Sequence, residues 1–400
     1  MLFGALGAPE EGFMDFEFSE DQKAAGESAR RYLEAKCKPE AVRDVMDGAA
    51  SHDGAASHDG VLWEGLAQMG FAGITVPEEY GGLGLGYLHL CMVAEQLGRV
   101  LAPVPFSSVI LATECLMEAG SAAQKQSWLP KLAAGQAIGT LALADRPGAV
   151  SRKAIRLAAN GCRLNGEKLA VADGQAADFA IVAGLAEAEA EAVALYLVDL
   201  RGDGIVRTAT PTLDPSRGHA NIRFENALAE KLGQPGAGWP VIERVLDRMA
   251  VITAFEQTGG ADRALEMARD YALTRMAFGR PIGAFQAIKH MLADMYVAAT
   301  LARSNAYYGA WALSTGAPEL PQAAAAARIS ASRAFQLCAK NNIQTHGGMG
   351  FTWAFDCHLF YRRAALLALN LGAAPSWEDR LINAMRRGTG PAAGDNHEFR

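Results

Sequence analysis

The sequence lacks the patterns that mark several classes of protein. Its six cysteines are dispersed over 400 residues with no CxxC pair or metal-ligand spacing, so we expect free thiols in a reducing compartment and no metal site. There is no basic excess, because the net charge is −7, which argues against nucleic acid or an anionic membrane surface as the main partner. No window reaches the length of an uncharged membrane-spanning helix, and residues 1–15 lack the basic region of a signal peptide. These absences predict a cytoplasmic globular protein.

The period of the apolar residues changes twice along the chain. Ser19, followed by two acids, indicates a helix start, and apolar helical segments continue to about residue 137. About seven short strand-like stretches then span Ile138 to Gly233, after which the pattern is helical again. We predict an α+β fold made of an N-terminal all-helical domain, a middle β-sheet or barrel domain and a C-terminal helical bundle domain, with the boundaries 14–137, 138–233 and 239–390.

Residues 48–60 repeat themselves as GAASHDGAASHDG. The repeat is polar and Gly-rich, so we interpret it as a mobile surface loop. The alternative is that its two His and two Asp bind a metal.

The stretch from Gln344 to Arg363 concentrates unusual residues. It carries Gly347, Gly348 and Gly350 within four positions, then aromatic, acidic, His and Arg residues. Closely spaced glycines let the backbone approach a flat or anionic ligand without interference from Cβ atoms. A tight turn between two helices explains them equally well.

A second stretch, Tyr271–Tyr296, reads YALTRMAFGRPIGAFQAIKHMLADMY. Together with the first stretch and with the VPEEYGGLG turn of Val76–Gly84, it resembles the acyl-CoA dehydrogenase family. The match runs from about Phe16 to about Leu381. The residues that carry it are Tyr271, Arg275, Phe278, Gly279, Phe285, Gln286, Ala293, Asp294, Met295, Gln344, Gly347, Gly348, Gly350 and Phe351.

This resemblance implies a fold with an N-terminal helical domain, a middle β-domain and a C-terminal four-helix bundle. It implies a flavoprotein that uses FAD to desaturate an acyl-CoA thioester between its α and β carbons, in lipid or steroid catabolism. It also implies an oligomer, a tetramer built as a dimer of dimers, made of one chain or of two related acyl-CoA dehydrogenase subunits.

Six residues become candidate cofactor contacts through the resemblance. In relatives the pair that matches Arg275 and Phe278 holds the flavin dinucleotide, partly across a subunit boundary; a guanidinium suits phosphate oxygens and a ring suits an apolar part. Gln286 begins the next helix, and Gln344, Gly347 and Gly348 resemble the segment that meets the adenosine and diphosphate of a neighbour's cofactor. The alternatives are a helix-end Arg beside a core Phe, a solvated Gln, and a helix-joining turn.

The sequence departs from the family at the catalytic base, which must take the α proton while a hydride leaves the β carbon. Most relatives have a Glu seven residues after the first Gly of the Gly-Gly pair, where this chain has Ala354. Others have it 26 positions before the Arg of the Arg-x-x-Phe pair, where this chain has Met249. We therefore assign no catalytic residue. Asp356 and Glu256 are the nearest acids; Asp356 is a substitute base or, alternatively, an ion-pair partner of Arg362 or Arg363.

The β-domain departs as well. Relatives often contact the flavin ring through an acidic-Pro-x-x-Gly-Ser-Asp segment and an aromatic-Ile-Thr-Asn segment. The corresponding residues here, 144–149 and 166–174, read ADRPGA and GEKLAVADG. The aromatic residue and its hydroxyl partner are absent, which puts ring binding by this chain in doubt.

Two further sites keep two interpretations each. Asp247–Arg248 is either a surface pair or a cation near a CoA phosphate. His358 is either a packed or capping residue or an acid-base group.

Three functions are compatible with these residues. The first is an FAD enzyme that desaturates an acyl-CoA with a base not yet located. The second is a subunit without catalysis of its own that completes a partner's FAD site, as in bacterial branches with paired subunits, some of which handle steroid side chains. The third is a flavin monooxygenase or oxidase on the same fold.

Overall fold

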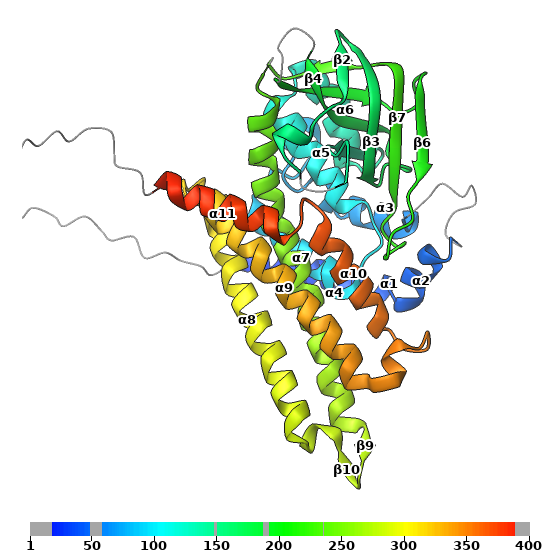
Figure 1. Cartoon of the computed structure of the whole chain (residues 1–400), viewed down its shortest axis with the longest axis vertical. Coiled ribbons are helices and arrows are strands. Elements are labelled where there is room, and N and C mark those ends of the chain that lie inside the picture. The colour runs from blue at the N-terminus through cyan, green and yellow to red at the C-terminus, as the bar shows by residue number, and fades with distance from the viewer. Residues whose placement is uncertain (1–17, 49–57, 148–149, 187–191, 235, 389–400) are drawn as a thin grey trace, which may run out of the picture.

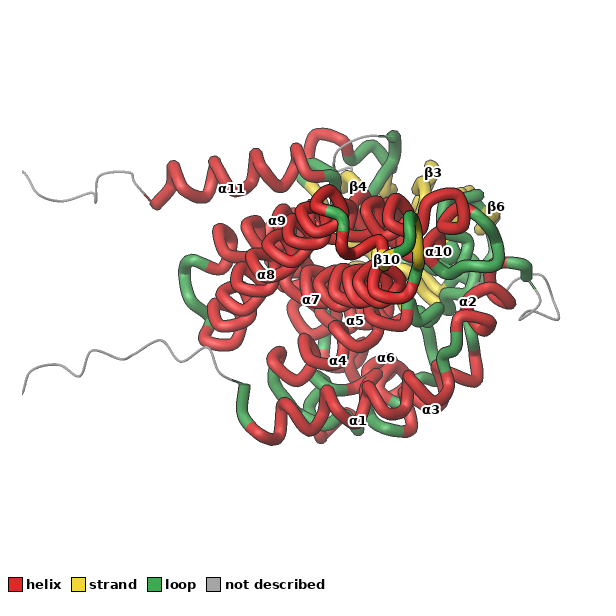
Figure 2. Tube along the Cα trace, turned by 90° about the horizontal axis from the view of Figure 1, so that it is seen from below, coloured by secondary structure: helices red, strands yellow, loops and turns green. Residues whose placement is uncertain are grey.

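A computed structural model describes residues 18–48, 58–147, 150–186, 192–234 and 236–388, so most of the duplicated 48–60 loop lies outside the described residues. Ser19 begins the first helix, with a capping box in which its hydroxyl accepts from the Gln22 N–H and the Gln22 side chain accepts from the Ser19 N–H. Six helices of the N-terminal part pack together along one side of the molecule (Figure 2). They are α1 (Glu20–Lys36), α2 (Pro39–Met46), α3 (Gly60–Gln68), α4 (Tyr87–Val100), α5 (Phe106–Ala119) and α6 (Ala122–Ala133).

The middle of the chain forms an eight-stranded sheet at one end of the molecule (Figure 1). The strand order is β6-β7-β3-β2-β4-β5-β8, with β1 parallel to β4. Helices α5 and α6 cover the sheet, and Trp128 of α6 lies 4.3 Å from the ring of Phe179. The strands are β1 (Gly139–Ala142), β2 (Ala158–Asn160), β3 (Arg163–Ala172), β4 (Phe179–Ala186), β5 (Val193–Asp199), β6 (Ile205–Ala209), β7 (His219–Leu228) and β8 (Glu230–Leu232).

The C-terminal part is a bundle of long helices that projects away from the sheet (Figure 1). Its far end is a two-stranded ribbon, and α10 and α11 pack on α9 (Figure 2). The elements are α7 (Gly238–Thr274), β9 (Met276–Ala277), β10 (Arg280–Pro281), α8 (Gln286–Thr315), α9 (Leu320–His346), α10 (Cys357–Leu369) and α11 (Ala374–Gly388).

Close helix crossings explain two glycines in this framework. A Cβ atom at Gly98 of α4 would lie 1.8 Å from the Glu256 carbonyl oxygen of α7, and one at Gly260 would lie 2.4 Å from the ring of Phe335 on α9. These positions admit no side chain, so α7 touches both the N-terminal helices and the rest of the bundle.

The α+β architecture predicted from the sequence is confirmed. Between Ile138 and Gly233 the described residues form eight strands, where the sequence indicated about seven. Helix α10 begins inside the stretch Gln344–Arg363, which we had interpreted through its glycines.

Candidate functional site

The ribbon at the far end of the bundle presents Phe278 to solvent. Helix α7 ends at Thr274, and its C-cap residue Arg275 has an extended backbone (φ −73°, ψ 121°). Met276–Ala277 then pair with Arg280–Pro281, so Phe278 and Gly279 form a two-residue turn with φ of 53° and 76°. Positive φ suits Gly but is strained for an aromatic residue. The Phe278 side chain is 96% exposed, so the strained turn holds a large apolar ring out of the protein.

The Gly-rich loop follows α9. Gln344 is exposed on the last turn of α9, and Gly347 has φ 60° and ψ −140°, a conformation that requires Gly. A Cβ atom at Gly350 would lie 2.7 Å from the Ile343 carbonyl oxygen, but one at Gly348 would meet nothing within 4 Å. Nothing within the described chain therefore requires Gly at position 348.

The ribbon and the Gly-rich loop are linked by one stack of rings. Tyr271, one turn before Arg275, stacks on His346 with centroids 4.0 Å apart, and Phe355 packs edge-on against both rings. Burial lowers the pKa of His346, so the stack contains a neutral imidazole near neutral pH. The structure thus brings the last helical turn of α7, before Arg275, next to the last helical turn of α9, before Gly347. Gln286 is exposed at the start of α8, beyond the ribbon.

Neither family position for a base carries a proton acceptor. Ala354 lies in an exposed turn, and Met249 is fully buried in α7. The expected ion pair of Asp356 with Arg362 or Arg363 was wrong. Asp356 accepts a 2.5 Å hydrogen bond from Arg43 of α2, which also donates to the Trp353 carbonyl.

The two arginines of α10 have other partners. Arg362 donates to the Leu213 carbonyl at 2.9 Å, and Arg363 donates to Asp214 at 2.5 Å and to the Ser216 hydroxyl at 2.9 Å. Arg363 is 1% exposed. Sequence reasoning missed Arg363 as a structural residue because its partner lies 149 residues away.

Two buried ion pairs meet where the β-domain, α7 and α10 come together. Arg217 lies 2.6 Å from Glu256, Arg363 lies 2.5 Å from Asp214, and Arg363 also lies 3.7 Å from Glu256. We call Asp214, Arg217, Glu256 and Arg363 the junction cluster. All four are less than 8% exposed. Burial would raise the pKa of Asp214, but Arg363 and the Ser216 hydroxyl bring that pKa below its ordinary value, which indicates that its carboxylate is charged.

Glu256 lies on the same face of α7 as Met249, because seven residues make nearly two helical turns. Its second oxygen is 3.4 Å from the Ser107 hydroxyl of α5. The neighbouring Ser108 donates at 2.6 Å to Asp173, the last polar residue of the 166–174 segment. The junction beside Met249 is therefore polar and hydrogen-bonded within the chain.

Residues 166–174 of the β-domain make their contacts within the chain. Ala170 has φ 47° beside a β-bulge of β3, and its N–H donates to the Asn221 side chain at 2.9 Å. Lys168 is fully buried, 2.6 Å from Asp145 and 3.0 Å from the Leu143 carbonyl, and burial lowers its pKa to about 8. Residues 169–172 offer no aromatic ring and no hydroxyl.

The two ambiguous sites are placed as follows. Asp247 pairs with Arg380 at 2.5 Å, whereas Arg248 pairs with Glu114 and Glu118, so they do not form the surface pair that we expected, and Arg248 already has two carboxylate partners. His358 stacks on Trp353 with ring centroids 4.6 Å apart, and neither ring nitrogen has a hydrogen-bond partner among the residues that the structure describes. Its pKa is lowered by burial and by Arg362 and Arg43. The structure therefore packs His358 and gives it no acid-base partner.

These residues fit one part of an FAD molecule and not another. The exposed ring of Phe278 and the open space beside Gly348 suit a dinucleotide that approaches from outside the chain. The 169–172 segment, without a ring or hydroxyl, does not suit a flavin ring. Among the residues that the structure describes, no group of three or more His, Cys, Asp or Glu could hold a metal ion, and no helix in the same ranges is long and apolar enough to cross a membrane.

The two helical parts of the chain match known protein domains. Residues 19–136 match the acyl-CoA dehydrogenase N-terminal domain, and residues 236–374 match the acyl-CoA dehydrogenase C-terminal domain. The acyl-CoA dehydrogenase IpdE2 of Mycobacterium tuberculosis is 33% identical over 305 residues, 76% of this chain and 80% of the relative.

Two solved structures are similar over nearly the whole chain. The ChsE4–ChsE5 complex from Mycobacterium tuberculosis contains a chain that is 27% identical with a TM-score of 0.83, covering 94% of this chain and 100% of that one. The Tcur3481–Tcur3483 steroid ACAD, in a variant form, contains one that is 27% identical with a TM-score of 0.81, covering 92% and 98%. The chain belongs to the acyl-CoA dehydrogenase family.

Proposed function

We propose that this chain takes part in the FAD-dependent α,β-desaturation of an acyl-CoA thioester as one subunit of a heteromer, in which a related subunit supplies the base. FAD, when bound, accepts the hydride that leaves the β carbon. The present chain contributes Arg275, Phe278, Gln286 and the Gln344–Gly348 loop to the partner's cofactor, and keeps no base of its own. The similarity to chains of the ChsE4–ChsE5 complex supports an assembly of related subunits.

One contrast carries this proposal. Phe278 is held 96% exposed by a strained turn, whereas Ala354 and Met249 leave both base positions without a proton acceptor. A strained, exposed aromatic residue is costly for a chain that acts alone. Such an exposed ring is useful if the subunit assembly covers it.

The junction cluster also supports the proposal that a related subunit, and not this chain, supplies the base. Glu256, the acid nearest to Met249 on the same face of α7, is bound to Arg217 at 2.6 Å. Both of its carboxylate oxygens already have partners, Arg217 on one and the Ser107 hydroxyl on the other. Glu256 therefore stabilises the junction and does not replace the missing base.

The test is a visible absorbance spectrum of the chain purified alone, before and after addition of FAD, followed by co-expression with the adjacent gene. We expect a colourless protein that fails to take up FAD, and a yellow complex after co-expression. Arg275→Ala and Phe278→Ala should lower the FAD content of that complex without preventing its formation. A yellow homo-oligomer with one FAD per chain that desaturates acyl-CoA would contradict the proposal.

A further inference from the structure

Helix α2 is fastened to the rest of the molecule by one charged side chain. The helix has eight residues, and a helix this short is unstable in water without tertiary contacts. Two of its valines are buried. Among the described residues of α2, Arg43 alone forms side-chain hydrogen bonds outside the helix; it donates to Asp356 at 2.5 Å and to the Trp353 carbonyl at 3.3 Å. Both partners lie in residues 347–356, which connect α9 to α10 and which we call the α9–α10 loop.

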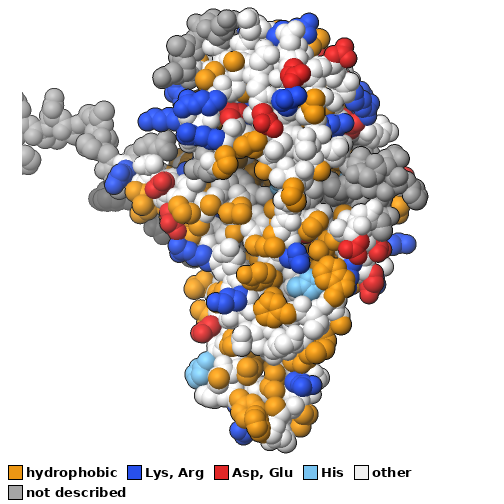
Figure 3. All heavy atoms as spheres, turned by 45° about the vertical axis from the view of Figure 1, so that its right-hand side comes forward, with side chains coloured by type: hydrophobic (Ala, Val, Ile, Leu, Met, Phe, Trp, Pro, Cys, Tyr) orange, Lys and Arg blue, Asp and Glu red, His pale blue; other side chains and the backbone are white. Residues whose placement is uncertain are grey.

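The α9–α10 loop depends on few contacts within the described chain for its shape. It contains three glycines, which lose more conformational freedom on ordering than other residues do. The rings of Phe351 and Trp353 are 77% and 50% exposed, and Figure 3 shows hydrophobic side chains at the surface of the bundle half of the molecule. Trp353 stacks on His358, and Phe355 packs on the ring stack described above. The loop therefore combines two ring contacts with one polar anchor, Arg43.

The bridge from Arg43 to the loop lies in a partly buried place. The side chains of Arg43 and Asp356 are 16% and 33% exposed, and a charge-assisted hydrogen bond is shorter and stronger than a neutral one. The Nε atom of Arg43 is buried and has no hydrogen-bond partner among the described residues, so this cation depends on Asp356 for compensation. The two bonds reach the loop on either side of Ala354, and they fix the backbone there.

We propose that Arg43 is a positioning residue, which holds the α9–α10 loop in the shape in which its glycines meet a ligand from outside the chain. This inference rests on the proposed function, in which Gly347 and Gly348 contribute to a partner's cofactor. In this role Arg43 need not touch the ligand. It orders the loop before binding, so that binding does not have to supply the free energy of ordering.

The first measurement is hydrogen exchange of the isolated chain, which requires neither FAD nor a partner subunit. It follows the amides of Thr352, Phe355 and Leu359, which donate to carbonyl groups of the loop. In Arg43→Gln these amides should exchange about tenfold faster, because loss of a charge-assisted bond lowers the cost of local opening. Asp356→Asn, which keeps a good N-cap residue for α10, should have a smaller effect. The double variant should exchange no faster than Arg43→Gln, because both changes remove the same bridge.

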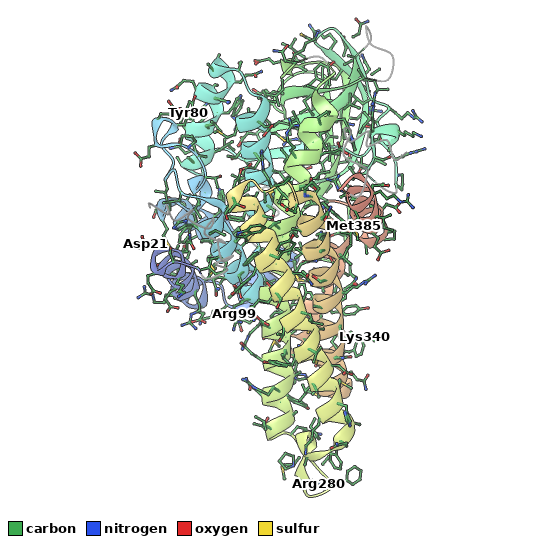
Figure 4. The ribbon with its side chains drawn as sticks, turned by 90° about the vertical axis from the view of Figure 1, so that its left-hand side faces the viewer. Asp21, Tyr80, Arg99, Arg280, Lys340 and Met385 are labelled. Atoms are coloured by element: carbon green, nitrogen blue, oxygen red, sulfur yellow. The ribbon has the colours of Figure 1, made fainter. Side chains whose placement is uncertain are left out.

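Arg99→Gln is the matched control. Arg99, which is labelled in Figure 4, pairs with Glu266 at 2.8 Å, and the two side chains are 23% and 30% exposed, close to the values for Arg43 and Asp356. This pair joins α4 to α7, so its loss should change the exchange of the loop by less than about twofold. Arg43→Lys, which keeps the charge but has fewer donors, should restore part of the protection.

The second measurement is the dissociation constant for FAD of the assembly that takes it up, homomeric or co-expressed. Arg43→Gln should weaken binding about threefold or more, Arg43→Lys should recover part of the affinity, and Arg99→Gln should leave it unchanged. Unchanged loop exchange in Arg43→Gln would overturn the proposal. Faster exchange with unchanged FAD affinity would overturn it too, because Arg43 would then stabilise the loop without positioning it for a ligand. If the unaltered chain takes up FAD in neither assembly, the proposed function fails, and the exchange measurement alone decides whether Arg43 orders the loop.

Discussion

Replacing Glu256 by Gln tests the energetic role of the junction cluster. The change leaves Arg217 and Arg363, which are 7% and 1% exposed, without the carboxylate that lies 2.6 Å and 3.7 Å from them. Removing one member of a buried ion pair typically costs about 3–5 kcal/mol, because the other charge stays buried without compensation. For a chain of 400 residues an unfolding entropy of about 2.1 cal/mol/K per residue converts this cost into a melting temperature lower by about 4–6 °C.

The assay is thermal unfolding at fixed protein concentration, because assembly makes the melting temperature depend on concentration. A double variant, Arg217→Met with Glu256→Leu, should recover most of the loss, since apolar residues of similar volume often replace a buried ion pair at no cost. The matched control is Glu378→Gln, whose ion pair with Arg333 is 41% and 67% exposed and should contribute less than about 1 kcal/mol. If Glu256→Gln shifts the melting temperature no more than Glu378→Gln does, the reasoning is refuted.

Three further variants test individual positions. Gly350→Ala should destabilise the chain by about 1–3 kcal/mol, since the added Cβ atom would lie 2.7 Å from the Ile343 carbonyl oxygen. Gly348→Ala, where a Cβ atom meets nothing, should leave the melting temperature unchanged and lower only the FAD content of the assembly. Equal melting temperatures for the two variants would contradict this. Phe278→Gly should raise the stability of the isolated chain by about 1 kcal/mol, because it removes a non-Gly residue from positive φ. It should also lower the amount of FAD that the assembly retains. A melting temperature below that of the parent chain would show that Phe278 is not strained. The pKa of His358 is lowered in the folded chain, so the unfolded state binds more protons below the ordinary pKa of about 6.5, and stability should fall as the pH drops through that value. His358→Phe should flatten this part of the plot of melting temperature against pH. An unchanged slope would show that His358 does not contribute.

Local patterns predicted the fold well and the junction poorly. The helix start at Ser19 depends on its neighbours in the sequence, so its signal is readable there. Arg363 depends on Asp214, and Glu256 depends on Arg217, across 149 and 39 residues. No period or motif reports which distant side chains share a buried space. The interpretation of Asp356 was wrong for this reason, because its partner Arg43 is 313 residues away.

The two ends of the candidate site also differ in whether the partners of their residues lie within the chain. At the end of the bundle, Arg275 forms no ion pair with a described residue, and the Phe278 ring is 96% exposed although it meets Phe285 edge-on. Nothing in the described ranges requires Gly at position 348. At the junction, every charge of the cluster has a partner of opposite sign inside the chain. A chain that performed the reaction at its own junction would need an acid with a free proton-accepting oxygen beside Met249 or at position 354. In this chain Glu256, which lies on the same face of α7 as Met249, is instead paired with Arg217 and joins α7 to the β-domain. We therefore look for the cofactor at the exposed end of the bundle, where the assembly proposed above would place it.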